Sequence, residues 1–517
     1  MTTTHPHQVP DGTRAGLREW AALAALMLPV LMVSVDNTVL SFALPEVSSS
    51  LQPTGTQLLW IVDIYALMLA GLLIAMGSLG DRVGRRRLLL LGAVGFGIAS
   101  LVAAYSSTPQ MLMVARALLG FFGATLMPST LSLIRNVFAH AHDRRIAIAA
   151  WAAMFSGGAA LGPILGGWLL EHFWWGSVFL INVPIVIVLI PLALALVPES
   201  RDPAPGPVDP TSIALSMLAM FPVVYAIKHG SKAGLDDLTL ASVALGVGAG
   251  WLFVRRQQRS ARTPGASPML DVSLFRNPVF SGAIVANLLS LMGFTGFLFF
   301  GAQLLQLVLG LSPMDSAMVL LPGLVITVTG GFLAVRLVRH FPVRVLVSMS
   351  FVASSMGYAI AAFTGQPTVV SVMVAFAIMG LGIGIAETLT NDLILASVPP
   401  HKAGSASAIS ETAYEVGAVL GTAVLGSVLT ATYRANLDVP PVVGDGGSTF
   451  ETLGSTMAAA DGYPNVIGER LAESARIAFD LGVQRSSGVA IGIALLAAWV
   501  SWRALRGAPE AVPGPTR

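Results

Sequence analysis

Long apolar runs alternate with short polar segments along almost the whole chain. The runs are roughly 18–25 residues long, the length that an α-helix needs to cross a hydrocarbon core about 30 Å thick. Their continuous apolar character differs from the short alternating segments of a membrane β-barrel. The pattern predicts fourteen membrane-spanning helices, near residues 20–44, 56–79, 87–106, 110–133, 145–170, 177–197, 211–229, 236–255, 279–308, 313–337, 343–363, 368–394, 404–431 and 486–506.

The composition points to the same class of protein. Of the 517 residues, 55% are hydrophobic and 11% are charged, and the mean hydropathy is +0.76, whereas soluble domains contain about 25% charged residues. The chain has no cysteine, which excludes disulfides and thiolate metal sites. The net charge of +2 is small and the basic residues are spread over short loops, which argues against a nucleic-acid partner. We therefore predict an all-α integral membrane protein without a metal or another cofactor.

Positive charge occurs in alternate loops between the predicted helices. The basic loops contain Arg82, Arg85, Arg86, Arg87, Arg135, Arg144, Arg145, Arg201, Arg255, Arg256, Arg259, Arg262, Arg339, Arg344 and Lys402. Short loops without Lys or Arg lie near residues 51–55, 107–109, 171–176 and 309–312. One loop, near residue 230 with Lys228 and Lys232, breaks the alternation. The positive-inside rule predicts that both termini are cytoplasmic, as an even number of spans requires.

The polar segments outside these spans differ in character. They comprise cytoplasmic tails at residues 1–19 and 507–517, a proline-rich linker at 198–210, and a long external loop at 432–485. Within the external loop, Ile467, Leu471 and Ala475 recur at helical spacing with charges between them. This spacing predicts either a surface helix packed on the outer mouth or a lid over an external vestibule.

The loop between the second and third spans has a motif that is more specific than a merely basic loop. Its sequence is GSLGDRVGRRR, and its distinctive residues are Gly77, Gly80, Asp81, Arg82, Gly84 and Arg85. The glycines permit a tight backbone turn at the membrane edge. Asp81 offers a charge partner among the arginines. We expect this loop to serve conformational change.

Two further motifs lie inside predicted spans. Arg116 lies within the apolar fourth span, where an unpaired arginine is rare. In the fifth span, Gly158, Gly162 and Gly166 recur every four residues and share one face, which lets another helix approach closely. Pro163 removes one backbone hydrogen bond and favours a bend. This combination suits a helix that rocks or seals, although the glycines alone also fit a static packing groove.

Together these motifs resemble those of the major facilitator superfamily, and in particular of its fourteen-helix drug:proton antiporters. The loop between the second and third spans matches the family's cytoplasmic signature, and residues 116–128 and 157–167 are similar to its helix 4 and antiporter motifs. The first span, with Asp36, is similar to a motif of the fourteen-helix branch. Further runs that resemble the antiseptic and quaternary-ammonium exporters are residues 59–71, 174–184, 268–277 and 410–421.

The resemblance implies two six-helix halves, residues 20–197 and 279–506, with residues 198–278 holding the linker and two extra helices. Residues 334–347 look like a degraded copy of the first basic loop, as repeated halves would produce. Such repeats support alternating access to a site near the midplane of the membrane.

The implied activity is proton-coupled export of lipophilic, mainly cationic drugs, antiseptics or dyes across the bacterial cytoplasmic membrane, by a monomer. The alternative is export of a native lipid, siderophore or metabolite, with drug efflux incidental. The sequence contains no P-loop motif for ATP. It also offers no nucleophile constellation or histidine cluster, so we do not expect an enzyme.

Acidic residues within the spans are the main candidates for a site, because an unpaired acid there is costly. They are Asp36, Asp63, Glu387, Asp392, Glu411 and Glu415. Asp36 matches the family motif and is expected to couple protons with Arg116, with a structural ion pair as the alternative. Asp63 suits either substrate attraction at the outer mouth or simple interfacial placement.

The remaining acids belong to the second half of the chain. Glu411 and Glu415 are four residues apart, share a helix face, and match acids of the antiseptic exporters. Glu387 departs from those relatives and is the candidate for a substrate-recognition acid peculiar to this protein. Asp392 is expected to be capped or solvated. Thr327 stands where some relatives place an acid, which puts efficient handling of dications in doubt.

Aromatic side chains could complete a cation site by stacking on the substrate. The candidates are Trp60, Tyr65, Phe294, Phe297 and Phe300. The alternative is that they pack the core or anchor the interface, as most membrane aromatics do.

Overall fold

The computed structural model describes residues 14–201, 209–263, 268–399, 402–443 and 447–507. Within these ranges all regular structure is helical. Fourteen helical stretches are long and apolar enough to cross a membrane, which confirms the predicted number of spans. Most of both tails and of the proline-rich linker lie outside the described residues, so their assignments stay predictions.

The first group of helices forms an N-terminal bundle. Its members are α1 (Leu17–Leu51), α2 (Gly55–Val83), α3 (Arg85–Ala104), α4 (Pro109–Val137), α5 (Ala141–His172), and the short α6 (Ser177–Leu180) followed by α7 (Asn182–Leu196). Helix α1 packs against α5 and α7, and α4 packs against α2 and α3. The next two helices, α8 (Pro210–Ala233) and α9 (Asp237–Ser260), form a hairpin whose first helix contacts α2.

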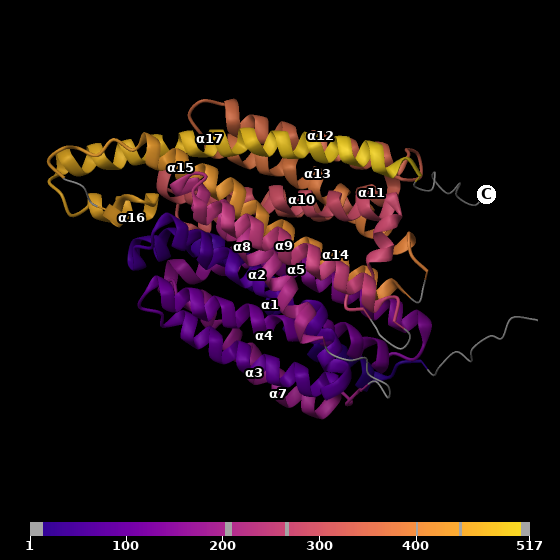
Figure 1. Ribbon diagram of the computed structural model, residues 1–517. Helices are drawn as coiled ribbons and strands as arrows, with labels where there is room; N and C mark the ends of the chain where they lie inside the picture. The colour runs from indigo at the N-terminus through magenta and orange to yellow at the C-terminus, as the bar shows by residue number, and fades with distance from the viewer. Residues whose placement is uncertain (1–13, 202–208, 264–267, 400–401, 444–446, 508–517) are drawn as a thin grey trace, which may run out of the picture.

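The remaining helices form a C-terminal bundle. They are α10 (Pro278–Gln303), α11 (Pro313–Leu337), α12 (Val343–Phe363), α13 (Val369–Ala396), α14 (Ala403–Gly421), α15 (Ser427–Asn436), α16 (Leu453–Ala460) and α17 (Asn465–Ala504), with 3-10 turns η1 (Val272–Arg276), η5 (Gly447–Phe450) and η6 (Leu505–Gly507). Two π-helical turns continue α10 and α14, namely η2 (Leu304–Val308) and η4 (Thr422–Gly426). Figure 1 shows α3 and α7 at one edge of the molecule, α12 and α17 at the other, and the α8–α9 hairpin between them.

Several helices begin where the sequence supplies a capping side chain. The hydroxyls of Thr54, Thr108 and Ser312 each accept a hydrogen bond from a backbone N–H in the first turn of the following helix. Two of these caps are followed directly by a proline, Pro109 and Pro313, at a position where the missing N–H costs nothing. These local signals explain why the observed starts lie close to the predicted ones.

The molecule has two faces where loops gather. We call the one that carries the connections α2–α3, α4–α5, α7–α8, α9–α10, α11–α12 and α13–α14 the basic face, because the predicted basic loops lie there. The other is the opposite face. The two bundles touch along α2–α14 and α5–α11.

The segment predicted as a separate surface helix or lid belongs to the last span. Helix α17 begins at Asn465 and runs without a break to Ala504, so the expected start near residue 486 is wrong. Leu471 and Ala475 are fully buried, and this part of α17 packs against α15 and α16. The charged residues between them interrupt the apolar run, so the sequence did not show that this helix is continuous with the last span.

Candidate functional site

Asp36 of α1 and Arg116 of α4 form a buried ion pair in the N-terminal bundle. The Arg116 Nη1 lies 2.5 Å from Asp36 Oδ2, and both side chains are almost completely shielded. Arg116 also donates through Nε to the Ile61 carbonyl at 3.3 Å, and its guanidinium lies 4.4 Å from the centre of the Tyr65 ring. The two residues that sequence reasoning linked therefore lie together, and their contacts join α1, α2 and α4.

A second buried ion pair was not predicted. Lys228 Nζ of α8 lies 2.8 Å from Asp63 Oδ2 of α2, and both side chains are at most 1% exposed. The same ammonium donates to the Leu59 carbonyl at 3.1 Å and lies 4.0 Å from the centre of the Trp60 ring. Lys228 therefore lies inside α8 and not in a loop, and the burial of Asp63 argues against interfacial placement, one of its two alternatives. The signal that could have found the pair is Gly234, which ends α8 six residues after Lys228.

The acids of the C-terminal bundle have a different environment. Glu411 and Glu415 lie one turn apart on α14, and Glu387 lies on α13. Within the described residues none of the three forms an ion pair, in contrast to Asp36 and Asp63. Asp392 is exposed, as expected.

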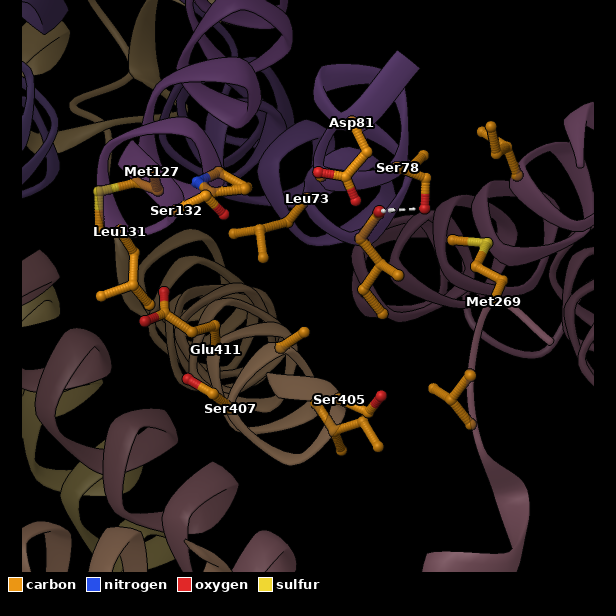
Figure 2. Close-up of a pocket in the computed structure, with 18 of the residues that line it drawn as sticks. Leu73, Ser78, Asp81, Met127, Leu131, Ser132, Met269, Ser405, Ser407 and Glu411 are labelled. Carbon is orange, nitrogen blue, oxygen red and sulfur yellow. Dashed lines mark hydrogen bonds between the residues drawn. The ribbon is translucent and has the colours of Figure 1, made fainter. Parts of the chain in front are cut away.

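A cavity of about 440 Å³ opens between the bundles at the basic face and is called the basic-face cavity. Its walls come from α2, α4, α5, α14 and the start of α8, with Met269 and its neighbours at the rim. Figure 2 shows Glu411 reaching from α14 toward Leu131 of α4, with Asp81 of α2 across the cavity. Glu411 thus presents a carboxylate to a space large enough for a drug-sized molecule. Glu387 does not line this cavity.

A smaller cavity of about 60 Å³, the central cavity, lies deeper between the bundles. Its polar and aromatic lining consists of Asn37, Thr38, Ser41, Asp63, Tyr65, Arg116, Phe294, Thr295, Phe299, Tyr414, Glu415 and Thr422. Thr422 belongs to the π-helical turn η4, and such turns are frequent at functional sites. The cavity brings one partner from each ion pair next to an unpaired acid, Glu415.

The predicted aromatic residues lie in three different environments. Phe294 and Tyr65 line the central cavity. Phe297 is buried and packs against Phe300 and Phe376, so it belongs to the core. The face of the Trp60 ring is already occupied by Lys228, as described above.

The turn between α2 and α3 is shorter than the three glycines of its motif suggested. Only Gly84 forms the turn, with a φ of +113°, since Gly77 and Gly80 lie inside α2. A Cβ at Gly84 would lie 2.8 Å from the Glu199 carboxylate, which accepts a hydrogen bond from the Arg86 N–H at 3.1 Å. Sequence reasoning missed Glu199, which follows α7 and has no local pattern around it.

The charged residues of this loop have separate environments. Asp81 and Arg85 form an ion pair at 2.7 Å. Arg82 is exposed. Asp81 also lines the basic-face cavity, so the motif lies where the two bundles separate.

The glycine face of α5 lies against α1, as the spacing predicted. A Cβ at Gly158 would meet the Ser34 hydroxyl, one at Gly162 would meet the Thr38 hydroxyl, and one at Gly166 would lie 2.9 Å from Val39. Pro163 leaves the Ala159 carbonyl without its helical donor, and the Thr38 hydroxyl donates to it at 3.0 Å. Thr38 is two residues from Asp36, so the α1–α5 seam adjoins the first ion pair.

Contacts close the opposite face between the bundles. The side chain of Gln306 donates to the Phe42 carbonyl at 3.1 Å, and the hydroxyls of Ser48 and Thr452 lie 2.6 Å apart. Glu451 accepts from the Gly55 N–H at 3.0 Å and from Lys232 at 2.8 Å. The larger cavity lies at the basic face, so this conformation is open toward that face and closed at the other.

Known proteins resemble the chain over most of its length. The family model described as Major Facilitator Superfamily matches residues 26–422. The multidrug efflux pump LfrA of Mycolicibacterium smegmatis is 50% identical over 96% of this chain and 98% of its own length. The methyl viologen resistance protein SmvA of Salmonella typhimurium is 36% identical over 89% and 93%. The tetracenomycin C resistance and export protein of Streptomyces glaucescens is 32% identical over 83% and 80%.

Solved structures share the fold at low sequence identity. A bacterial homologue of the human lysosomal transporter Spinster, in an inward-facing and occupied conformation, has a TM-score of 0.66 and 18% identity, covering 95% of this chain and 98% of that one. The xylose transporter XylE of E. coli, in an inward open conformation, has a TM-score of 0.57 and 15% identity, covering 96% and 98%. These similarities support the fold and the two-bundle arrangement.

Proposed function

This chain belongs to the major facilitator superfamily of membrane transporters, and we propose that it exports lipophilic, mainly cationic drugs, antiseptics and dyes in exchange for protons. The observation that carries the proposal is the contrast between the acids at the two cavities. Glu411 and Glu415 lack a protein cation among the described residues, whereas Asp36 holds Arg116. The names of the relatives, which include a multidrug efflux pump, agree with this proposal.

The basic face is the cytoplasmic side in this proposal. Loops rich in Arg stay in the cytoplasm under the positive-inside rule, and the larger cavity is on that side. Both ends of the described chain, at α1 and α17, then face the cytoplasm of a bacterium. A cationic compound would enter the basic-face cavity from the cytoplasm or the inner leaflet.

Glu411 and Glu415 attract the cation in the proposed mechanism. A carboxylate in a low-dielectric cavity interacts more strongly with an opposite charge than one in water does. Phe294 and Tyr65 offer aromatic surface at the central cavity, where a cation gains from contact with a ring. Because the central cavity holds only about 60 Å³, a drug-sized molecule binds in the basic-face cavity until the bundles move.

Asp36 carries the coupling proton in the proposed mechanism. Protonation of Asp36 removes the charge that holds Arg116, and so weakens the contact between α1 and α4. One elementary charge that crosses a potential of 100 mV releases about 2.3 kcal/mol. Rocking of the bundles about the α2–α14 and α5–α11 contacts then alternates access between the two faces. A monomer contains every residue that this mechanism uses.

Transport by an Asp36→Asn variant in proteoliposomes tests the proposal. We expect the wild type to move ethidium when a proton gradient is imposed, and the variant to bind ethidium but lose the gradient-driven transport. Asp392→Asn, which removes an exposed acid on α13, is the matched control and should transport like the wild type. Full gradient-driven transport by Asp36→Asn would falsify the coupling role, and proton release with metabolites but not with cationic dyes would favour the alternative substrate class.

A further inference from the structure

Lys228 occupies a site that has the features of an organic-cation site. Its ammonium contacts a carboxylate oxygen of Asp63 at 2.8 Å, the Leu59 carbonyl at 3.1 Å, and the face of the Trp60 ring at 4.0 Å. Carboxylates and aromatic faces are the groups that bind ammonium ligands. Here the protein supplies the cation itself, from a helix of the α8–α9 hairpin.

Asp63 also belongs to the central cavity. It lines that cavity together with Glu415 of α14 and Thr422 of η4. Two carboxylates therefore border one small space, one from each bundle. Asp63 is neutralised by Lys228, whereas Glu415 has no ion-pair partner within the described residues. Arg116, which also lines the cavity, is neutralised by Asp36.

Lys228 thus sets the net charge at the α2 wall of the central cavity. With Lys228 in place, Asp63 offers no free negative charge to a substrate. Without it, Asp63 would be a buried acid with no protein counter-cation, able to ionise against a second positive charge of the substrate. A second negative centre of this kind attracts a doubly charged substrate more than a singly charged one, because the interaction energy scales with the product of the charges.

We propose that Lys228 is a specificity-determining residue, an internal counter-cation of Asp63 that disfavours substrates with a second positive charge. The inference rests on the proposed export of organic cations and gives the α8–α9 hairpin a part in substrate choice. The neighbouring Lys232 is one turn further along α8 and contacts Glu451 at the opposite face. Lys232 is not among the residues that line the central cavity and so serves as the matched control.

The test compares binding of two dyes with the same aromatic core to purified protein in detergent. Ethidium carries one positive charge and propidium carries a second on a quaternary ammonium arm. Fluorescence polarisation gives the ratio of the two affinities for each variant. Because the ratio is taken within one preparation, differences in yield cancel. Heat-denatured protein gives the background.

The variants form a charge series at the Lys228 site. Lys228→Met, which leaves Asp63 unpaired, is expected to raise the relative affinity for propidium about tenfold. Asp63→Asn, which leaves Lys228 unpaired, should lower it below the wild-type value. The double variant Asp63→Asn with Lys228→Met restores neutrality and should return to the wild-type ratio, as should Lys228→Arg and Lys232→Met.

The outcomes separate this inference from the proposed function. If the ratio is the same in all folded variants, Lys228 has only a packing role and the inference is overturned. If Lys228→Met does not fold, Asp63→Asn and the double variant still decide the question, since their expected ratios differ. If the wild type binds neither dye, the proposed export of organic cations fails instead.

Discussion

The buried acids of the two bundles differ in whether they have an ion-pair partner. In the N-terminal bundle, Asp36 is paired with Arg116, and Asp63 is paired with Lys228 from the hairpin. In the C-terminal bundle, Glu411 and Glu415 line the cavities without an ion-pair partner in the described part of the chain. A buried pair resists disruption, because removal of one partner leaves an uncompensated charge. An unpaired acid is available to a cation or a proton from outside.

The same contrast extends to the backbone around these acids. The first ion pair is fixed by contacts with the Ile61 carbonyl and the Tyr65 ring, next to the tightly packed seam of α1 and α5. In the C-terminal bundle, the helix that carries both glutamates continues as the π-helical turn η4. Such turns often mark functional sites. The comparison indicates a tightly packed framework around the acids of the N-terminal bundle and an irregular helix next to those of the C-terminal bundle.

The largest effect should come from breaking the first pair. Arg116→Leu leaves Asp36 buried without a partner, and we expect it to lower the free energy of unfolding by about 3–5 kcal/mol. The double variant Asp36→Asn with Arg116→Leu removes both charges and should regain most of this loss. Melting temperatures in detergent, with size-exclusion profiles, measure the difference. Equal melting temperatures for the single and the double variant would contradict a paired framework.

Removal of a buried acid from the C-terminal bundle should lower transport without lowering stability. Glu411→Gln and Glu415→Gln take away charges that have no protein partner, so we expect dye transport to fall about tenfold, equivalent to 1.4 kcal/mol. The melting temperature should stay the same or rise, because burial of an unpaired charge is relieved. Glu473→Gln, on the exposed side of α17, is the control and should transport normally. If either variant is as unstable as Arg116→Leu, the contrast between the bundles is lost.

The spans could be predicted from the sequence because each is a continuous apolar run. The prediction failed at α17, where Glu469, Arg470 and Glu473 interrupt the run. On the helix they lie on the exposed side, while Leu471 packs inward. The spacing of Ile467, Leu471 and Ala475 did predict a helix here, but it could not show that this helix is continuous with the last span.

The site was predictable only where a motif carried it. Asp36 and Arg116 both belong to recognisable motifs, and their proximity was expected. Lys228 belongs to no motif, and its partner Asp63 is 165 residues earlier in the chain. Whether a lysine near the end of a span is buried or solvated depends on where the helix ends and on which helix faces it. The first could have been inferred from Gly234, whereas the second is a property of the tertiary structure.

The smallest effect should come from a charge pair at the surface of the hairpin that also carries Lys228. Asp209 accepts two hydrogen bonds from the Arg256 guanidinium, at 2.8 and 2.9 Å, and caps α8 by accepting from the Ser212 N–H. The Arg256 contacts, followed by those of Ser212, lower the pKa of Asp209 from its ordinary value of 3.8 to about 2. The pair is partly exposed, so solvent weakens it.

Two substitutions separate the charge of Asp209 from its cap. Asp209→Asn keeps a good capping side chain and should cost at most about 1 kcal/mol, whereas Asp209→Ala also removes the cap and should cost about 1 kcal/mol more. Because the folded-state pKa is lowered, the charge stabilises the protein above about pH 4, and this contribution is lost as the pH falls toward 2. The difference in melting temperature between the wild type and Asp209→Asn should therefore be smaller at pH 3 than at pH 7. If Asp209→Asn lowered the melting temperature as much as Arg116→Leu, the buried Asp36–Arg116 pair would be no more important for stability than the exposed Asp209–Arg256 pair.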